Sequence, residues 1–256
     1  MVRRFLSRPL IQRSGQFSLR YVLVVPFVML VLAVMLVGWM SVWNGQTAVN
    51  EVTRQLRNEV TVRVQQNLRT YLKTPHVVNQ INADAIRLGH LDVADTTGLG
   101  RHFWRQIQLF DPVISIALGR PSGDFIGVGR PGNDVFPALR LGLAGQETGG
   151  RFYSFALDSE GDREGDPAIG SVYDPRSRPW YEKATQAGKA TWSEIYTDFA
   201  DPRLVITASQ PIYDADGNLQ AVLATDLLLS QINNFLRTTK IGRNGQTFIV
   251  EASGAL

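Results

Sequence analysis

The sequence predicts a protein of the α+β class, with an N-terminal transmembrane helix, a long helix after it and an antiparallel sheet module. Three observations predict this class. An uncharged, almost wholly apolar run occupies residues 21–43, apolar residues then recur every three or four positions, and short strand-like segments separated by turn residues follow from residue 113 onward. The chain has 256 residues, of which 44% are hydrophobic and 19% charged, a composition that indicates a folded protein.

The apolar run at residues 21–43 is long enough to cross a bilayer as a helix, which needs about 20 apolar residues. Tyr21, Trp39 and Trp43 lie near its two ends, where aromatic residues favour the lipid headgroups. A cleaved signal peptide would have a shorter apolar core of about 7–15 residues. Five arginines precede the run and none closely follows it, which predicts that residues 1–20 are cytoplasmic. Everything from about residue 44 should then lie outside the inner membrane.

A long stalk helix is predicted to leave the membrane. Its evidence is one apolar helical face made by Val49, Val52, Leu56, Val60, Val64, Leu68 and Tyr71. We expect this face to be a packing surface, and we expect the protein to form a homodimer through the stalk helix. Thr74-Pro75 should end or kink the helix, because proline disfavours helical backbone before it. Two further helices are expected at residues 77–88 and 100–109.

The pattern then changes to that of strands. We expect strands at residues 113–118, 125–128, 151–157, 192–196, 204–213 and 219–227. Between them we expect an acidic loop at residues 158–166 and a short helix at residues 178–187, and after them a second helix at residues 228–236. The last two of these strands are joined at Asp-Ala-Asp-Gly, a hairpin signal.

A further strand is expected at residues 246–251, close to the end of the sequence. A lone strand would leave its backbone groups unpaired and its apolar face uncovered. We therefore expect residues 241–256 to begin a second, truncated module, and the sequence to be a piece of a longer protein.

Composition argues against several classes of function. The chain has no cysteine, which removes disulfides, thiolate catalysis and zinc–cysteine sites, and its three histidines are scattered. The net charge of +3 comes from the five N-terminal arginines, since 21 basic and 23 acidic residues remain without them. The basic isoelectric point is therefore no argument for a nucleic-acid partner.

Two motifs fail on inspection. Gly127-Val-Gly-Arg-Pro-Gly132 matches the GxGxxG pattern of dinucleotide sites. Such a site needs a helix that begins within the motif, and Pro131 disfavours one. We therefore expect these glycines to lie in a loop. The acidic loop has Arg163 and Ile169 where a calcium loop requires glycine and glutamate. No catalytic signature is present. We expect no catalysis, no cofactor and no metal site within these residues.

One motif remains, between residues 173 and 226. It reads Tyr-x-x-x-x-Arg-x-Trp-Tyr, then Tyr-x-Asp, then a single aspartate on the last long strand, and its residues are Tyr173, Arg178, Trp180, Tyr181, Tyr196, Asp198 and Asp226. It resembles the signature of the amino-acid-binding subset of double Cache (dCache) domains. These are extracytoplasmic sensors of bacterial chemoreceptors, histidine kinases and nucleotide cyclases. The resemblance covers about residues 44–256 and implies a PAS-like membrane-distal module at residues 44–240.

The resemblance also implies roles for these residues. The arginine, the tryptophan and the first tyrosine would hold the carboxylate of a free amino acid, and the later tyrosine and the two aspartates would hold its ammonium. The residue types suit this chemistry independently. Arg178 offers a planar fork for a carboxylate, while Asp198 and Asp226 can accept hydrogen bonds from an ammonium. The tyrosines add hydroxyls and ring faces suited to a cation.

Structural alternatives stay open for each residue. Arg178 could pair with Asp174, Trp180 and Tyr181 could be core aromatics, and Asp226 could cap the next helix. The expected function is sensory input to a transmembrane receptor, with a histidine kinase favoured as the output domain and a nucleotide cyclase or chemoreceptor as alternatives. An amine is the second expected ligand, and a ligand-free interaction module is a further alternative.

Overall fold

A computed structural model of the protein describes residues 19–132 and 139–238. Most of the expected cytoplasmic segment and the strand expected at residues 246–251 lie outside the described residues. The chain forms two compact units, Met1–Glu59 and Val60–Leu256. Each unit is described by itself.

In the described part of the first unit, the chain is helical throughout. Helix α1 (Leu19–Arg87) begins here, and nearly all side chains between residues 23 and 59 are exposed, including large apolar ones such as Leu30 and Leu36. Among the described residues, α1 is the one helix that is long and apolar enough to cross a membrane by its length and composition. The apolar run at residues 21–43 lies within it.

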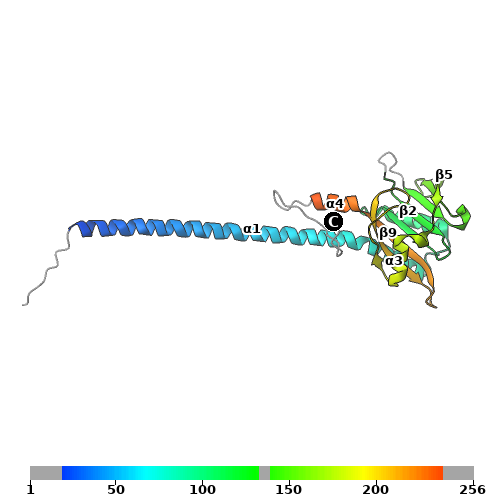
Figure 1. Ribbon diagram of the computed structural model, residues 1–256, viewed down its shortest axis with the longest axis horizontal. Helices are drawn as coiled ribbons and strands as arrows, with labels where there is room; N and C mark the ends of the chain where they lie inside the picture. Colours follow the sequence, from blue (N-terminus) through cyan, green and yellow to red (C-terminus); the bar gives the residue numbers. More distant parts are fainter. Residues whose placement is uncertain (1–18, 133–138, 239–256) are drawn as a thin grey trace, which may run out of the picture. The chain divides into compact units, whose positions relative to one another are not determined.

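The second unit contains the end of α1 and a nine-stranded antiparallel sheet (Figure 1). Its helices are α2 (Thr96–Ile107), α3 (Pro179–Ala187), α4 (Leu229–Thr238) and the short 3-10 turns η1 (Gln146–Thr148) and η2 (Pro175–Ser177). Its strands are β1 (Ser115–Gly119), β2 (Phe125–Gly129), β3 (Arg140–Ala144), β4 (Arg151–Leu157), β5 (Arg163–Val172), β6 (Thr191–Trp192), β7 (Tyr196–Thr197), β8 (Leu204–Tyr213) and β9 (Leu219–Leu228). The strand order is β5-β4-β3-β2-β1-β9-β8-β6, with β7 also pairing with β8. This arrangement confirms the predicted α+β class.

The two faces of the sheet differ because side chains alternate along a strand. On one face, large apolar residues pack with α2 and the end of α1 to form the main core, whose members include Val78, Phe103, Ile107, Ile116, Ile126, Leu141 and Leu223. The other face carries small residues at the centre of the sheet and is partly covered by α3, which packs against β8 and β9 (Figure 1). One face therefore stabilises the fold, and the other has room for a cavity.

Helix α1 is held on the core face by a buried polar contact. The side chain of Asn79, which is fully buried, donates to the carbonyl of Ala208 at 2.8 Å and accepts from the hydroxyl of Thr225 at 2.7 Å. These bonds reach β8 and β9 at once. Directional hydrogen bonds of this kind fix the position of the helix along the sheet, which apolar packing alone does less well.

The structure corrects the helix predictions in two places. Residues on both sides of Pro75 belong to one helix, so of the two outcomes predicted for Thr74-Pro75, an end or a kink, the end is wrong. Proline costs one hydrogen bond there, but buried residues that follow it, including Val78 and Asn79, pack on the sheet and hold the helical conformation. Helix α2 begins earlier than expected because the Asp95 side chain caps it, accepting from two backbone N–H groups.

The sheet predictions also need correction. Strands β3 and β5 were not expected, and the second half of the expected acidic loop belongs to β5. Strand β5 is polar and exposed at the sheet edge, so its pairing with β4 depends on backbone hydrogen bonds that leave no apolar signal. The expected strand at residues 192–196 is split into β6 and β7. Gly127 and Gly129 lie in strand β2 rather than in a loop.

Replacing Asn79 by leucine should destabilise the protein by about 2 kcal/mol, because the Ala208 carbonyl and the Thr225 hydroxyl lose their side-chain partner while remaining buried. Urea unfolding of the full chain in detergent, followed by tryptophan fluorescence, measures the change. Asn67→Leu is the matched control, since Asn67 is exposed on the same helix, and should shift the midpoint little. Equal effects of the two substitutions would show that the buried contact does not hold the helix.

Candidate functional site

A cavity of about 850 Å³ lies on the sheet face opposite the main core. Its floor is made of small residues that the strand register aligns, namely Ala224, Ala117, Gly127 and Gly142. The two glycines are required where they stand. A Cβ atom at Gly142 would lie 2.6 Å from the ring of Phe152, and one at Gly127 would lie 2.9 Å from the ring of Phe125. Their absence of a side chain lets both aromatic rings lie against the sheet.

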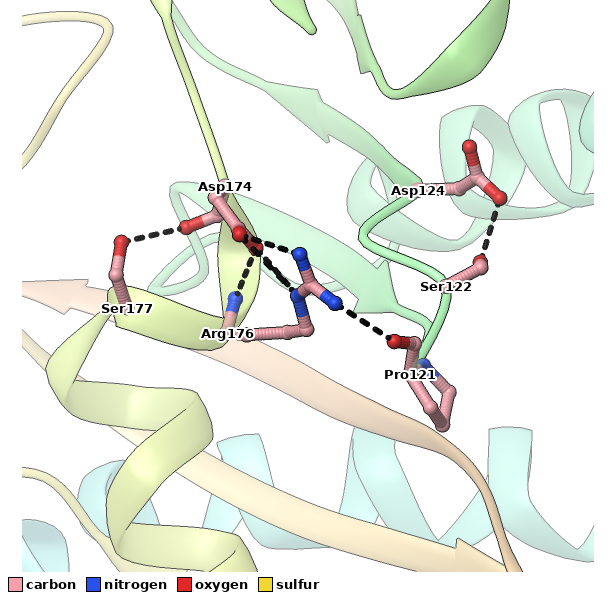
Figure 2. Close-up of polar contacts among 6 residues, drawn as sticks. All are labelled: Pro121, Ser122, Asp124, Asp174, Arg176 and Ser177. Atoms are coloured by element: carbon pink, nitrogen blue, oxygen red, sulfur yellow. Dashed lines mark hydrogen bonds and ion pairs between the residues drawn. The ribbon is translucent and has the colours of Figure 1, made fainter.

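The turn before α3 presents Arg178 to this cavity. In this turn the Asp174 carboxylate accepts from the backbone N–H of Arg176 and pairs with the Arg176 guanidinium at 2.7 Å (Figure 2). The same guanidinium donates to the Pro121 carbonyl in the β1–β2 turn at 3.2 Å (Figure 2). Asp174 is therefore occupied by its neighbour. The alternative in which it pairs with Arg178 is not observed.

Arg178 instead faces aromatic rings. Its guanidinium carbon lies 5.9, 5.6 and 5.7 Å from the ring centres of Tyr173, Tyr196 and Phe199, and its Nη2 atom donates to the Thr197 carbonyl at 3.3 Å. It forms no ion pair with any carboxylate in the part of the chain that the structure describes. A cation held by rings and a carbonyl, and lining a cavity, keeps its attraction for an anion.

Two carboxylates line the same cavity. Asp226 is buried on β9, where burial, together with the neighbouring charge of Asp198, raises its pKa to about 7. Burial also raises the pKa of Asp198, although its carboxylate accepts from the backbone N–H of Asp201 at 3.1 Å. Arg203 acts on Asp198 but pairs with Asp201, and Asp226 forms no ion pair among the described residues. A buried carboxylate without a cationic partner is costly when it is ionised.

Hydroxyl groups complete the polar lining. The Tyr196 hydroxyl lies 2.8 Å from the Thr207 hydroxyl, which in turn donates to Asp226 at 2.6 Å. The indole N–H of Trp180 donates to the hydroxyl of Tyr173. Burial raises the pKa of both tyrosines well above the usual range, so they stay protonated at neutral pH.

The structure brings six of the seven predicted residues to one cavity: Tyr173, Arg178, Trp180, Tyr196, Asp198 and Asp226. Tyr181 is the exception and lies outside the lining. Successive helical residues point in directions about 100° apart, so Trp180 and Tyr181 cannot face the same space. Tyr181 packs beside Gly119, and burial raises its pKa while the charges of Arg176 and Asp174 act on the same hydroxyl. Asp226 points into the cavity from a strand, so the alternative of a helix cap is also not observed.

Several lining residues were not predicted. Phe125, Phe152 and Phe199 form an aromatic wall around Tyr173, with ring centres 4.8 to 5.5 Å from it. Ser115 and Thr207 flank Asp226 on the neighbouring strands. Strand alternation could have placed all of these residues except Phe199, which follows β7, on a face of their own strands. Only the pairing of strands far apart in the sequence brings Ser115 and Thr207 to Asp226.

The region that carries most of this site matches a known family. Residues 146–234 match the model of the methyl-accepting chemotaxis protein-like, first PDC sensor domain. Curated relatives include McpC of Bacillus subtilis, 36% identical over 85 residues, and PctB of Pseudomonas aeruginosa, 36% identical over 84 residues. Each alignment covers 33% of this chain and 13% of the relative, so the comparison concerns a small part of those receptors.

Solved structures share the fold. The ligand-binding domain of the Campylobacter jejuni chemoreceptor Tlp3 aligns with a TM-score of 0.51 at 15% identity, over 74% of this chain and 64% of that domain. The ligand-binding domain of Pseudomonas fluorescens CtaA aligns with a TM-score of 0.50 at 21% identity, over 80% of this chain and 67% of that domain. The family model that matches residues 146–234 describes a sensor domain. These comparisons confirm the resemblance drawn from the motif: residues 146–234 are similar to the first PDC sensor domain of methyl-accepting chemotaxis protein-like receptors.

Proposed function

We propose that this chain is the sensory input region of a transmembrane chemoreceptor and that its cavity binds a free amino acid. One observation carries the proposal. A guanidinium without an acidic partner among the described residues and two aspartates whose pKa values are raised by burial line the same cavity. An amino acid zwitterion supplies the opposite charge to each.

The roles of the lining residues follow from this charge pattern. The ligand carboxylate would lie against Arg178, and the ligand ammonium would lie between Asp198 and Asp226, where it would pair with the buried carboxylates. The ring faces of Tyr173 and Tyr196 border this position. Support for the ligand class comes from two solved domains with this fold, since the Tlp3 domain was determined with 4-methylisoleucine and the CtaA domain with L-isoleucine.

The output that we propose is chemotactic signalling. The curated relatives named above are methyl-accepting chemotaxis proteins, and nothing in these comparisons supports the histidine kinase that the family resemblance favoured. In this proposal α1 anchors the protein in the inner membrane through residues 21–43, with residues 1–20 cytoplasmic and the sensor module at residues 44–240 outside. Val49, Val52 and Leu56 are exposed on α1 and would pack against a second copy of the stalk.

An amine is the second candidate ligand, because of one specific observation. Arg178 already donates to the Thr197 carbonyl and lies against three rings, and the Trp180 indole already donates to Tyr173. Both donors therefore have structural partners without a ligand carboxylate. The acids and rings alone would suit an amine.

Melting of the full chain in detergent separates these ligands. We expect at least one of the twenty common amino acids to raise the melting midpoint by about 5–10 °C at a hundred times its Kd, because it binds the folded state. Arg178→Ala should abolish this shift, while Arg176→Ala should retain it, since Arg176 is occupied by Asp174 outside the cavity lining.

The decarboxylated counterpart of each amino acid is the ligand control. An amine that shifts the wild type and the Arg178→Ala variant equally would identify the cavity as an amine site. Absence of any shift with every amino acid and amine would overturn the proposed binding function.

Affinity for the amino acid should decrease as the pH falls, because Asp226 becomes protonated. Its pKa in the ligand-free protein is raised to about 7, and Asp198, also raised, lies beside it. Below pH 7 a proton occupies the carboxyl that the ammonium needs, so affinity should drop by about tenfold per pH unit between pH 7 and pH 5 and level off above about pH 8. Isothermal titration calorimetry across this range measures it.

The matched control for this pH profile is Asp174→Asn, which removes a carboxylate outside the cavity lining and should leave the profile unchanged. Constant affinity from pH 5 to pH 8 would show that the ammonium does not bind at Asp226.

A further inference from the structure

Asp226 is flanked by hydroxyl side chains on both neighbouring strands. Thr207 on β8 and Ser115 on β1 are its direct partners in the antiparallel register. Directly opposed residues of antiparallel strands point to the same face of the sheet. The three side chains therefore stand in one row on the cavity side, with the carboxylate in the middle.

Both hydroxyls act on the carboxylate. The Thr207 Oγ1 atom donates to Oδ1 of Asp226 at 2.6 Å, and the Ser115 hydroxyl, opposite Asp226 in the strand register, lowers the pKa of this carboxyl from the other side. Thr207 is fully buried, and its oxygen lies 2.8 Å from the Tyr196 hydroxyl. A hydroxyl has one proton to donate. When Thr207 gives its proton to an ionised Asp226, it must accept from Tyr196, so the three groups form a chain that ends at the carboxylate.

We propose that Thr207 and Ser115 form a two-sided hydroxyl clamp that positions the Asp226 carboxylate for a cationic group of the ligand without neutralising its charge. This inference rests on the proposed function and adds the residues that position the Asp226 carboxylate. The clamp is distinct from the seven residues of the sequence motif. Thr207 and Ser115 are positioning residues, since they act on the ligand through Asp226.

The chemistry of the clamp suits this task. A lysine or arginine in either position would orient the carboxylate equally well but would compete with the ligand cation for it. Neutral donors stabilise the ionised form and leave the net charge in place. The groups whose charges act on Asp226, or on which it acts, include Asp198 from the segment after β7, Arg178 from the turn before α3, and the two protonated tyrosines, Tyr173 and Tyr196. The same cavity is also lined by Arg130, Arg140, Asp201 and Arg203. Arg178, the cation that acts on Asp226, lies against the aromatic rings.

Strand β9 provides a matched control one residue away. Thr225 is also fully buried and also donates its hydroxyl proton, but it points to the opposite face, where its partner is Asn79 on α1. The same substitution, threonine to valine, can therefore be made on both faces of one sheet. Only the change at Thr207 removes a donor from Asp226.

The test is an infrared titration of the full chain in lipid nanodiscs without any ligand. The carbonyl stretch of a protonated carboxylic acid is followed against pH and assigned to Asp226 by its loss in Asp226→Asn. In Thr207→Val the midpoint of this band should move to higher pH by about one unit, because the ionised form loses a donor. Thr207→Ser, which keeps the hydroxyl, and Thr225→Val should titrate as the wild type does.

The outcomes separate this inference from the proposed function. The titration needs no ligand. The midpoint can therefore shift in Thr207→Val even if no amino acid binds, and it can stay unchanged even if an amino acid binds. An unchanged midpoint in Thr207→Val, or an equal shift in Thr225→Val, would overturn the clamp. Should Thr207→Val not fold, Ser115→Ala removes the donor on the other strand and should move the midpoint in the same direction, and an unchanged midpoint there would overturn the clamp equally.

Discussion

The alternation of side chains along the central strands is the constraint on which this structure depends. On β9, Leu223 and Thr225 face α1 and α2, while Ala224 and Asp226 face the cavity. A shift of the pairing by one residue would exchange the two faces, placing the aspartate in the core and the leucine in the cavity. Register therefore determines both the stability of the module and the existence of its site.

The cavity keeps electrostatic features that a purely structural interior would avoid. A buried carboxylate next to a second acid costs free energy, and the raised pKa of Asp226 expresses that cost. Local rules are commonly broken at functional sites, because the unfavourable arrangement in the free protein becomes favourable when the ligand binds. The hydroxyls of Thr207 and Ser115 reduce the cost without removing the charge, which is why neutral residues suit those positions.

The site and helix α1 share two strands. Asp226 contacts the cavity and Thr225, its neighbour on β9, bonds to Asn79 of α1, whose amide also bonds to β8. A ligand that moves β9 relative to β8 would change both bonds at Asn79. Allosteric coupling needs such a connection between an element that touches the ligand and an element that leads elsewhere. In the proposed receptor, the hydrogen bonds of Asn79 to β8 and β9 would supply such a connection.

The sequence by itself determined the α+β class, the apolar segment within α1, the full extents of β4 and β8, and six of the seven predicted residues that line the cavity. Apolar periodicity and a motif of unusual residue types carry that information locally. Only the tertiary structure decided that α1 continues past Pro75, that the polar strand β5 joins the sheet, and that Tyr181 lies outside the cavity lining. It also decided that Ser115 and Thr207, 92 positions apart, meet at Asp226. These outcomes depend on packing and on pairing between distant segments, which leave no local pattern in the sequence.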